Sequence, residues 1–414
     1  MFARTLEEVQ SSPPKRAIYV RALLAILTIC VALSAIGFAR LGPWHRDLVD
    51  FDIFRIVAQR VWLGDADLAY HADKFLDMQR AASGGSDNFM PWTYPPQFDL
   101  LLAPLALVPT GMAYFLFIAA SLAFYLIVLR SVAASHFVVA LIVVLPATVV
   151  TIASGQNGFL TGGLIGLVCL FIEERPVAAG LALGLMVIKP HLAITFAAYA
   201  ILTRRWTVVV TAAALVLVSS LLCTVVFGPQ IWIALLQSVH DSAIFLERGY
   251  YPLFRMVSFY AGLRTVGLSA SAAFLGQAVV AACCLGIIAV ACYRQFPARW
   301  CLGLAAMLAV SISPYAYDYD LPIFGIGLAM LLPELKRSAG DGERRLIYAA
   351  PMIVGAYGNL LAATLGTSQK DVQGIDMLSI GGFILVALIP LMFVIALRSL
   401  RLETEVLAMG AEAG

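Results

Sequence analysis

The stretch IYVRALLAILTICVALSAIGFAR covers residues 18–40, and Val49-Asp50-Phe51-Asp52-Ile53-Phe54-Arg55 follows it closely along the chain. The first stretch is long enough to cross the hydrocarbon of a bilayer, because a spanning helix needs about 20 apolar residues. The second places two carboxylates and an arginine just beyond that crossing, where ionisable side chains are costly unless they serve a function. Together they predict a membrane-anchored chain with a polar site at the membrane surface.

The composition supports this prediction for the whole chain. Of 414 residues, 61% are hydrophobic and 13% are charged, with a mean hydropathy of +0.90. A soluble domain is about half apolar and about a quarter charged, so the class of soluble proteins is excluded. The seven cysteines fall in or at the ends of apolar segments and are typical of small buried residues. We expect an all-α polytopic membrane protein, with residues 1–414 forming one domain, membrane lipids around it and no nucleic acid as a partner.

Basic residues indicate the orientation of the chain in the membrane. Arg4, Lys15, Arg16 and Arg21 precede or open the first span, so the N-terminus is expected in the cytoplasm by the positive-inside rule. The first span lacks a small-residue cleavage site and is expected to stay as an anchor. Further apolar segments lie at about 109–129, 136–153, 159–172, 207–226, 268–292, 300–313, 321–334, 346–366 and 377–397.

Residues 176–203 do not fit a single crossing. Arg175 and the pair Arg204-Arg205 both have cytoplasmic character, and Lys189-Pro190-His191 lies midway between them. We expect a hairpin of two short helices broken at Pro190, whose non-helical backbone faces an interior cavity. The total is then about 10–12 membrane helices, with both termini cytoplasmic.

Two long polar stretches are expected outside the cytoplasm. The first covers residues 41–96 and includes a surface helix in which Ile53, Val57 and Val61 repeat at helical spacing and Gly64 ends the run. The second covers residues 228–265. Polar residues elsewhere also gather at the outer ends of apolar segments, so we expect them to converge on one extracytoplasmic site.

Asp50 and Asp52 are the candidate catalytic carboxylates of that site. A general base must lie within hydrogen-bond reach of the attacking hydroxyl, and a carboxylate at the membrane surface suits a substrate whose reactive head group is attached to a lipid. Arg55 shares a helical face with them and either pairs with them or binds a phosphate. The alternative is a solvated acidic end of a loop with no function.

The other outer-end residues are typical of a sugar or phosphate site. Tyr94, within Trp92-Thr93-Tyr94-Pro95-Pro96, can contact the face of a sugar ring, and Gln156 and Asn157 can bind sugar hydroxyls. Lys189 and His191 are costly in an apolar segment unless an anionic ligand or a carboxylate pairs with them. The alternatives are an interfacial turn, a glycine-flanked turn and a structural ion pair.

Asp318 and Asp320 alternate with tyrosines in Tyr315-Ala316-Tyr317-Asp318-Tyr319-Asp320. They can bind acceptor hydroxyls or, with Asp50, a divalent cation, although their spacing alone does not define a metal site. We therefore assign no metal and no cofactor. No phosphate-binding loop or dinucleotide fingerprint is present, so a nucleotide-sugar substrate has no evident binding site.

Several short motifs together resemble glycosyltransferase family 87, a group of integral membrane GT-C enzymes that includes a mycobacterial polyprenol-phosphate-mannose-dependent α-1,2-mannosyltransferase. The likeness runs over most of the chain, and the order and spacing of the motifs carry it. The motifs are Asp50-Phe51-Asp52-Ile53-Phe54, Gly64 with Tyr70, Tyr94-Pro95-Pro96, Pro104-Leu105, Gly155-Gln156-Asn157-Gly158, Ile188-Lys189-Pro190-His191, Arg204-Arg205-Trp206, Phe227-Gly228-Pro229 and Ser313-Pro314-Tyr315.

The resemblance implies a GT-C-type helical bundle, a polyprenyl-phosphate sugar donor and inversion at the anomeric carbon. Asp50 matches the family's acidic residue just past the first helix, which serves as catalytic base, and Asp52 is the reserve. Mannose is the expected sugar and a lipid or glycan hydroxyl the expected acceptor, in a bacterial cytoplasmic membrane. Mycobacterial relatives often carry histidines where this chain has Tyr317-Asp318-Tyr319-Asp320, so the sugar and the acceptor stay open. The alternatives are a flippase or transporter of a lipid-linked sugar, and a pentosyltransferase or ligase of the same superfamily.

Overall fold

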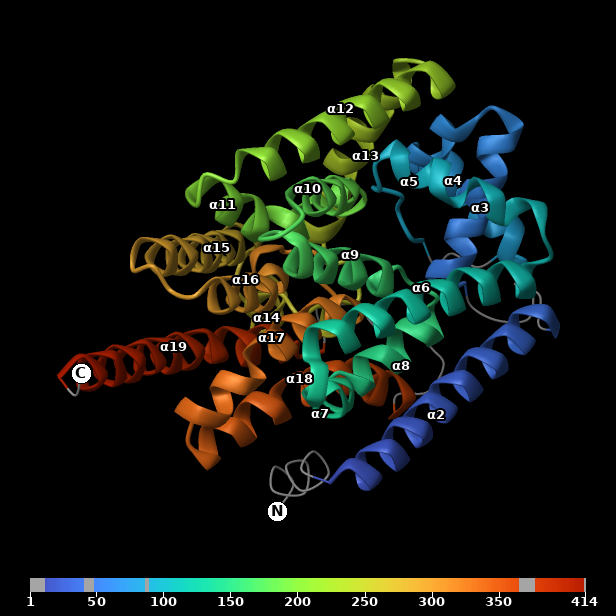
Figure 1. Cartoon of the computed structure of the whole chain (residues 1–414). Coiled ribbons are helices and arrows are strands. Elements are labelled where there is room, and N and C mark those ends of the chain that lie inside the picture. Colours follow the sequence, from blue (N-terminus) through green and yellow to red (C-terminus); the bar gives the residue numbers. More distant parts are fainter. Residues whose placement is uncertain (1–11, 41–47, 86–88, 365–376, 413–414) are drawn as a thin grey trace.

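The structure, a computed structural model, describes residues 12–40, 48–85, 89–364 and 377–412 and is built of helices (Figure 1). In these residues β-structure is limited to one isolated bridge, between Met256 and Tyr317. This architecture confirms the predicted all-α polytopic membrane protein. Five segments are long and apolar enough to cross a membrane, namely Pro13–Arg40, Thr110–Val143, Trp206–Phe227, Ala270–Tyr293 and Gly381–Arg401.

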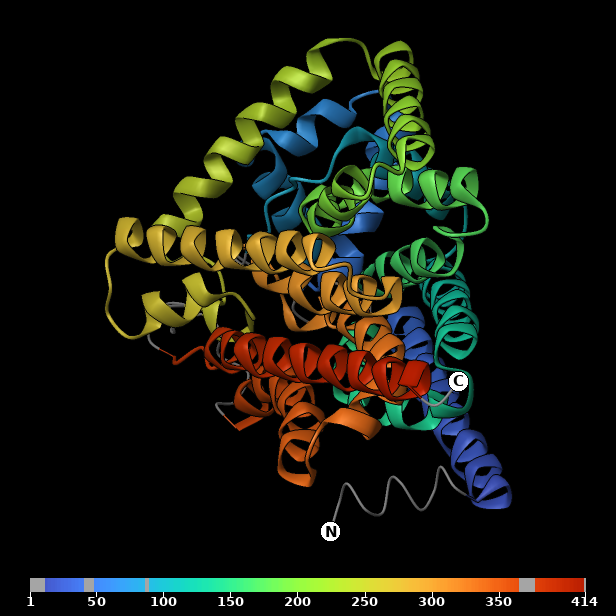
Figure 2. The ribbon, with the colours of Figure 1, turned by 60° about the vertical axis from the view of Figure 1, so that its left-hand side comes forward.

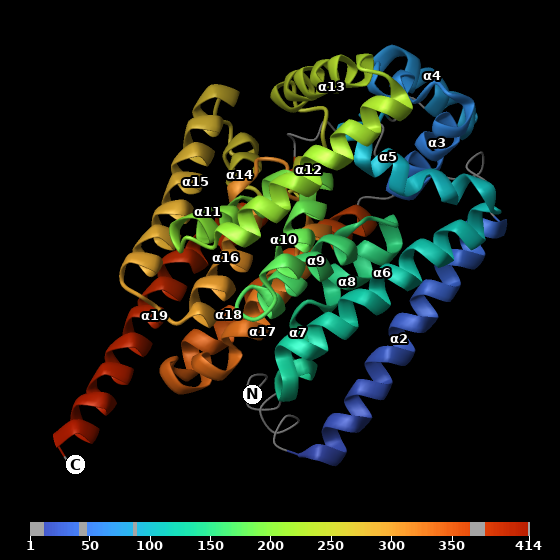
Figure 3. The same ribbon diagram turned by 45° about the horizontal axis from the view of Figure 1, so that its top comes forward.

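The first membrane helix precedes the outer segment that carries Asp50 in the chain. Helix α2 packs along α6, and the two run side by side in Figure 3. The predicted surface helix is present as α3, and Gly64 ends it with a φ of 76°, a left-handed conformation that suits glycine. The elements of this region are α2 (Pro13–Arg40), α3 (Asp50–Leu63), η2 (Ala66–Tyr70), α4 (Ala72–Ser83), α5 (Pro96–Leu102), η3 (Ala103–Leu107) and α6 (Thr110–Ala133).

The middle of the chain contains the broken hairpin expected around Pro190. Two short 3-10 helices meet at Lys189, which itself has a non-helical backbone with a φ of −143° and a ψ of 70°. The span expected over 136–153 is divided at Val144, because Pro146 lacks an N–H and begins a new helix. The elements are η4 (Ala134–His136), α7 (Phe137–Val143), α8 (Leu145–Ser154), α9 (Gly158–Phe171), α10 (Pro176–Leu185), η5 (Met186–Ile188), η6 (Pro190–Ala193), α11 (Ile194–Leu202) and α12 (Trp206–Phe227).

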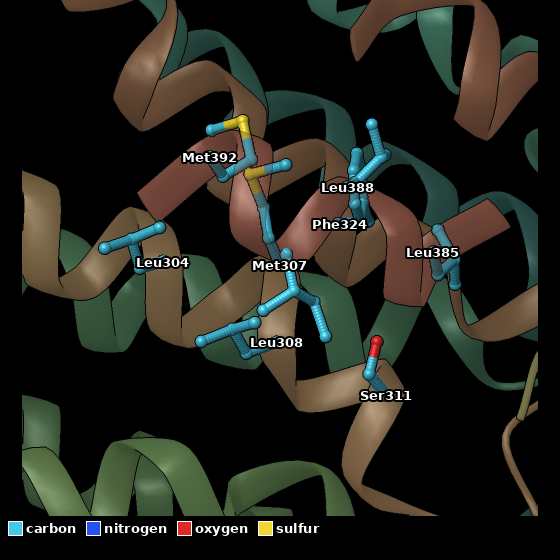
Figure 4. A pocket seen from close by; sticks show the side chains of 9 residues that line it. Leu304, Met307, Leu308, Ser311, Phe324, Leu385, Leu388 and Met392 are labelled. Carbon is cyan, nitrogen blue, oxygen red and sulfur yellow. The ribbon is translucent and has the colours of Figure 1, made fainter. Parts of the chain in front are cut away.

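The last third of the chain forms a packed bundle in which α16 and α17 are buried along almost their whole length. Figure 2 shows α15 and α19 beside this pair. A small apolar gap of about 10 Å³ lies between α16, α17 and α19, next to Met307 and Met392 (Figure 4). The elements are α13 (Gln230–Glu247), η7 (Leu253–Arg255), α14 (Phe259–Thr265), α15 (Ala270–Tyr293), α16 (Ala298–Ile312), η8 (Asp318–Asp320), α17 (Pro322–Ser338), α18 (Asp341–Thr364) and α19 (Gly381–Glu412).

The elements of the two long polar stretches lie at one end of the molecule. In Figures 1 and 3, α3, α4 and α13 occupy the end opposite the start of α2 and the end of α19. Polar segments that are far apart in the sequence, from Asp50 to Asp320, are thereby brought close enough to share a site.

Candidate active site

Asp50 begins α3 and points at the turn between α8 and α9. The side-chain amide of Gln156 donates a hydrogen bond of 2.8 Å to the Asp50 carboxylate. The carbonyl oxygen of the same amide accepts one from the Tyr94 hydroxyl at 3.1 Å. Asp50 and Tyr94 are half-buried, whereas Gln156 is buried. An accessible carboxylate is therefore held by a buried amide.

The surroundings of Asp50 raise its pKa above the ordinary value for an aspartate. Burial is the largest cause, because it disfavours the charged form. The charges of Arg255 and Lys189 and the hydrogen bond from Gln156 act in the opposite direction, and the charge of Asp318 adds to the rise. A carboxylate with a raised pKa is a stronger base once it is ionised, which suits proton abstraction.

Lys189 approaches the same cluster from the break in the hairpin. Its ammonium donates a hydrogen bond of 2.7 Å to Asp320, and both side chains are almost completely buried. The ammonium also lies 4.8 Å from the ring centre of Tyr319 and 5.8 Å from that of Tyr94. Since an unpaired ammonium would be very costly at this depth, the ion pair and the two rings keep Lys189 charged.

A second ion pair joins Arg255 to Asp318. The Nε and Nη2 atoms of Arg255 donate to the two carboxylate oxygens at 3.2 and 3.1 Å, a bidentate arrangement. The guanidinium carbon lies 5.9 Å from the ring centre of Tyr319. Arg255 and Lys189 thus flank one aromatic ring, and each is paired with one aspartate of Asp318-Tyr319-Asp320.

Backbone contacts fix the turn that carries these aspartates. Val257 donates its N–H to the carbonyl of Ala316 at 2.8 Å, next to the bridge between Met256 and Tyr317. The second oxygen of Asp320 accepts the N–H of Tyr317 at 3.1 Å and closes the turn. Asp320 therefore has two functions, since one oxygen caps η8 and the other binds Lys189.

The Gly155-Gln156-Asn157-Gly158 turn needs both of its glycines. Gly155 has a φ of 69°, and a Cβ atom there would lie 2.5 Å from the Cβ of Phe51 in α3. A Cβ atom on Gly158 would lie 1.9 Å from the carbonyl oxygen of Tyr319. These two close approaches bring α3 and η8 against the turn and place Gln156 between them.

Asn157 in this turn is fully buried, and its side chain has no hydrogen-bond partner within the described part of the chain. Neither the oxygen nor the nitrogen of the amide makes a hydrogen bond to this part of the chain. Burying such a group unpaired costs about 1–3 kcal/mol. A buried amide of this kind suits a polar ligand such as a sugar hydroxyl.

Tyr94 is held by a buried network behind the Trp92-Thr93-Tyr94-Pro95-Pro96 segment. The Asp99 carboxylate accepts hydrogen bonds from the Tyr70 hydroxyl at 2.8 Å and from the Trp92 indole at 2.9 Å. The Tyr70 hydroxyl is also 2.9 Å from the carbonyl of Tyr94. Phe54 packs edge-on against Tyr94, with ring centres 5.8 Å apart. Tyr94 is therefore held from behind by this network, and its hydroxyl is bonded to Gln156 on the other side.

Three further predicted site residues lie around Asp50 and Lys189, and their contacts differ from those of a catalytic base. They are Asp52, Arg55 and His191. Asp52 is buried and accepts the N–H of Val49 at 2.9 Å, which caps α3. Arg55 donates hydrogen bonds to the carbonyls of Leu105 and Val108 at 2.6 and 2.9 Å. These contacts differ from the expected contact with a carboxylate or phosphate. They attach α3 to the η3 region. His191 is half-buried and has Asp320 and Lys189 as its charged neighbours.

An apolar cavity of about 360 Å³ lies on the outside of the bundle near the break in the hairpin. It lies between α5, α9, α10 and α12 and reaches Ile188, the residue that precedes Lys189. Leu101, Leu185 and Leu222 line it and are exposed at the molecular surface. The cavity therefore opens on an apolar face, and its wall includes Ile188 at the break of the hairpin.

Arg255 and the Tyr319 ring are parts of the site that the sequence did not single out. Arg255 is one of several charged residues in the 228–265 stretch, and its pairing with Asp318 is a contact between distant segments. No local spacing marks it. In the sequence, Tyr319 was noted only as the residue between Asp318 and Asp320. In the described residues, no group of three or more His, Cys, Asp or Glu side chains is placed to hold a metal ion.

Comparison with known proteins gives one family match. A family model described as glycosyltransferase family 87 matches residues 92–314, more than half of the chain. The matched range includes Tyr94, Gln156, Asn157, Lys189 and Arg255, whereas Asp50 precedes it. No curated protein and no solved structure gives a significant match. The family match shows that this chain belongs to glycosyltransferase family 87 and is a membrane glycosyltransferase.

Proposed function

We propose that the chain transfers a sugar, with mannose the expected one, from a polyprenyl-phosphate carrier to a hydroxyl of a lipid or glycan acceptor, with inversion at the anomeric carbon. Asp50 is the general base. The observation that carries this proposal is the arrangement around Asp50. An accessible carboxylate with a raised pKa lies beside two buried or half-buried cations and next to a buried amide without a partner.

The donor's phosphate is assigned to Lys189. An ammonium in an apolar segment is stable only with anionic partners, and Asp320 uses one of its three N–H groups. The apolar cavity that ends at Ile188 has an open apolar side, which suits the isoprenoid chain of the donor. The lipid then enters sideways from the bilayer, and its phosphate stops at the cation.

The sugar is assigned to the space between Tyr94 and the 155–158 turn. Asn157 offers an unpaired donor and an unpaired acceptor, and aromatic rings such as that of Tyr94 pack on the apolar faces of sugars. Asp318, Asp320 and Gln156 act here by fixing the cations and Asp50. His191 stands at the edge of the same cluster.

The reaction follows from these positions. The acceptor hydroxyl gives its proton to Asp50 while its oxygen forms a bond to the anomeric carbon. The bond between that carbon and the phosphate oxygen breaks, and its electron pair leaves with the polyprenyl phosphate. The leaving group gains negative charge, so it needs a nearby cation more than a general acid. Asp50 becomes neutral in the same step.

The active site is assigned to the extracytoplasmic face of a bacterial cytoplasmic membrane, with both termini in the cytoplasm. Two observations support this side: the basic residues that precede the first span, and the location of α3, α4 and α13 at the end opposite the start of α2. A donor that is already attached to a lipid needs no nucleotide-binding fold there.

A donor panel tests the function. The purified chain is incubated with polyprenyl phosphates that carry radiolabelled mannose, glucose or arabinose, together with a lipid extract as acceptor. We expect transfer of label from the mannose donor, and transfer from the glucose donor would change only the assigned sugar. Transfer from arabinose alone would identify a pentosyltransferase. Movement of intact labelled donor across liposomes without cleavage would instead support a flippase and contradict the proposal.

A further inference from the structure

We propose that Arg255 is a second binding site for the phosphate of the lipid-linked donor, held ready by Asp318. This inference rests on the proposed function and adds a residue to it. Arg255 takes the place of Arg55 as the second cation of the site. The guanidinium of Arg55 is bonded to the carbonyls of Leu105 and Val108.

The geometry of the Arg255–Asp318 pair leaves one edge of the guanidinium free. The Asp318 carboxylate accepts hydrogen bonds from Nε and Nη2 of Arg255. No other hydrogen bond from Arg255 occurs in the described part of the chain, and the side chain is 18% exposed. Nη1 and the second N–H of Nη2 form the adjacent edge of the planar group. That edge presents two parallel donors, the geometry that fits two oxygens of a phosphate.

Asp318 gives Arg255 a fixed position before the donor arrives. The carboxylate is almost completely buried, and it binds Arg255 through two hydrogen bonds, which orient the guanidinium plane. A free arginine side chain loses considerable rotamer entropy when it binds a ligand. A guanidinium that is already oriented loses less, so the phosphate binds more tightly to it.

Arg255 lies close to the other groups of the reaction. It shares the Tyr319 ring with Lys189, and it is the cation whose charge acts most strongly on Asp50. The phosphate bond that breaks and the base that takes the proton must both be near the same sugar. One cation that contacts the phosphate and influences Asp50 satisfies both requirements.

The charges of the cluster balance along the reaction. Before transfer, Asp50, Asp318 and Asp320 face Lys189 and Arg255. Transfer of the acceptor proton makes Asp50 neutral while the leaving phosphate gains a negative charge. The total charge near Arg255 therefore stays constant, and the cation can remain paired with both Asp318 and the phosphate.

Binding of decaprenyl phosphate and of uncharged decaprenol to the purified full-length chain tests this inference. We expect the wild-type chain to bind the phosphate more tightly than the alcohol. Arg255→Gln should weaken phosphate binding by about tenfold or more and leave alcohol binding unchanged, because only the charged hydrogen bonds are lost. Arg255→Lys keeps a charge for Asp318 but has no second edge, so it should fold and bind the phosphate several-fold more weakly than wild type.

Arg264→Gln is the matched control. Arg264 belongs to the same outer stretch and donates to the carbonyls of Leu268 and Glu247, so its loss should not change the preference for phosphate over alcohol. A folded Arg255→Gln or Arg255→Lys chain with the wild-type preference would overturn the inference.

The pH dependence of transfer provides a second readout, which a purely structural role would not change. Without Arg255, the pKa of Asp50 should rise further, so the acid limb of the rate profile should move to higher pH. If the wild-type chain itself shows no preference for the phosphate and no transfer, the proposed function fails. If the wild-type chain transfers sugar and only the Arg255 variants behave as wild type, the assignment of Arg255 fails alone.

Discussion

Asp50 depends on a few neighbours for its ionisation. Burial raises its pKa, and the hydrogen bond from Gln156 is one of three contributions that hold the rise back. A buried amide in this place can donate to the carboxylate and also position Tyr94. Gln156 therefore favours the ionised form of the proposed base and also orients it.

Replacing Gln156 should move the pH dependence of the reaction. In Gln156→Ala the carboxylate of Asp50 loses a donor, its pKa rises, and the acid limb of kcat/KM moves up by about one to two pH units, since a hydrogen bond to a charged group contributes about 1.5–3 kcal/mol. The direction follows because the donor favours the charged form. Gln230→Ala, which removes an exposed amide bonded to Phe227, should leave the profile in place. An unshifted acid limb in Gln156→Ala would exclude Asp50 as the group that titrates.

Asn157 should show opposite effects on stability and activity. Asn157→Leu replaces a buried amide that has no partner in the described part of the chain, so thermal unfolding should occur at a higher temperature. Transfer should fall by about tenfold or more because the sugar loses a hydrogen-bonding group. Both are measured on purified chain, by unfolding scans and radiolabelled transfer.

Ser399→Ala is the control for this substitution, because Ser399 is a buried hydroxyl on α19 that likewise lacks a partner there. It should stabilise the chain without loss of activity. An Asn157→Leu chain with full activity would remove Asn157 from the sugar site.

Among the elements, the 155–158 turn is the joint that brings α3, α8, α9 and η8 together. Gly158 allows the start of α9 to touch the backbone of Tyr319, and a methyl group would meet that carbonyl oxygen at 1.9 Å. Neither partner can give way easily, because Asp318 and Asp320 tie η8 to Arg255 and Lys189.

Gly158→Ala should therefore separate η8 from α9 and destabilise the chain by about 1–3 kcal/mol. Transfer should fall as well, since Lys189 loses its alignment with Asp50. Gly286→Ala on α15 is the matched substitution, because a Cβ atom there meets nothing within 4 Å. If the unfolding temperature and the activity of Gly158→Ala equal those of Gly286→Ala, the turn does not have this role.

The sequence was sufficient to predict the helical elements and their apolar or polar character. Hydrophobic length marked the spans, Gly64 marked the end of α3, and Lys189-Pro190-His191 marked the break in the hairpin. Each of these features depends on neighbours in the chain. The division at Val144 was missed because the apolar run is continuous there, and only Pro146 signals the new helix.

The contacts between elements were predictable only in part. Asp50 and Asp320 were expected to share a site because both lie at outer helix ends, and Lys189 was added because the break at Pro190 was expected to face an interior cavity. The pairing of Arg255 with Asp318, and the bonds from Arg55 to two carbonyls, join residues 50 or more positions apart. Such partners depend on tertiary packing, and a single sequence contains no local pattern for them.

At the scale of the whole molecule, the proposed function requires the active-site end to face away from the cytoplasm. A membrane-impermeant maleimide applied to intact cells should label Asp73→Cys, since Asp73 is exposed on α4. Arg345→Cys, at an exposed position of α18, should react only after the cells are permeabilised. The unsubstituted chain gives the background from native cysteines. The reverse labelling pattern would place the site in the cytoplasm.

The most direct test of the molecule's proposed chemistry is the transfer rate of Asp50→Asn. This variant keeps the size of the side chain and a hydrogen-bonding partner for Gln156 but removes the base. Asp73→Asn on the same outer stretch is the control and should transfer at the wild-type rate. We predict that Asp50→Asn binds decaprenyl phosphate as tightly as wild type and unfolds at a similar temperature, while its kcat falls by about 100-fold to 10,000-fold. Transfer by Asp50→Asn at the wild-type rate would contradict the assignment of Asp50 as the base.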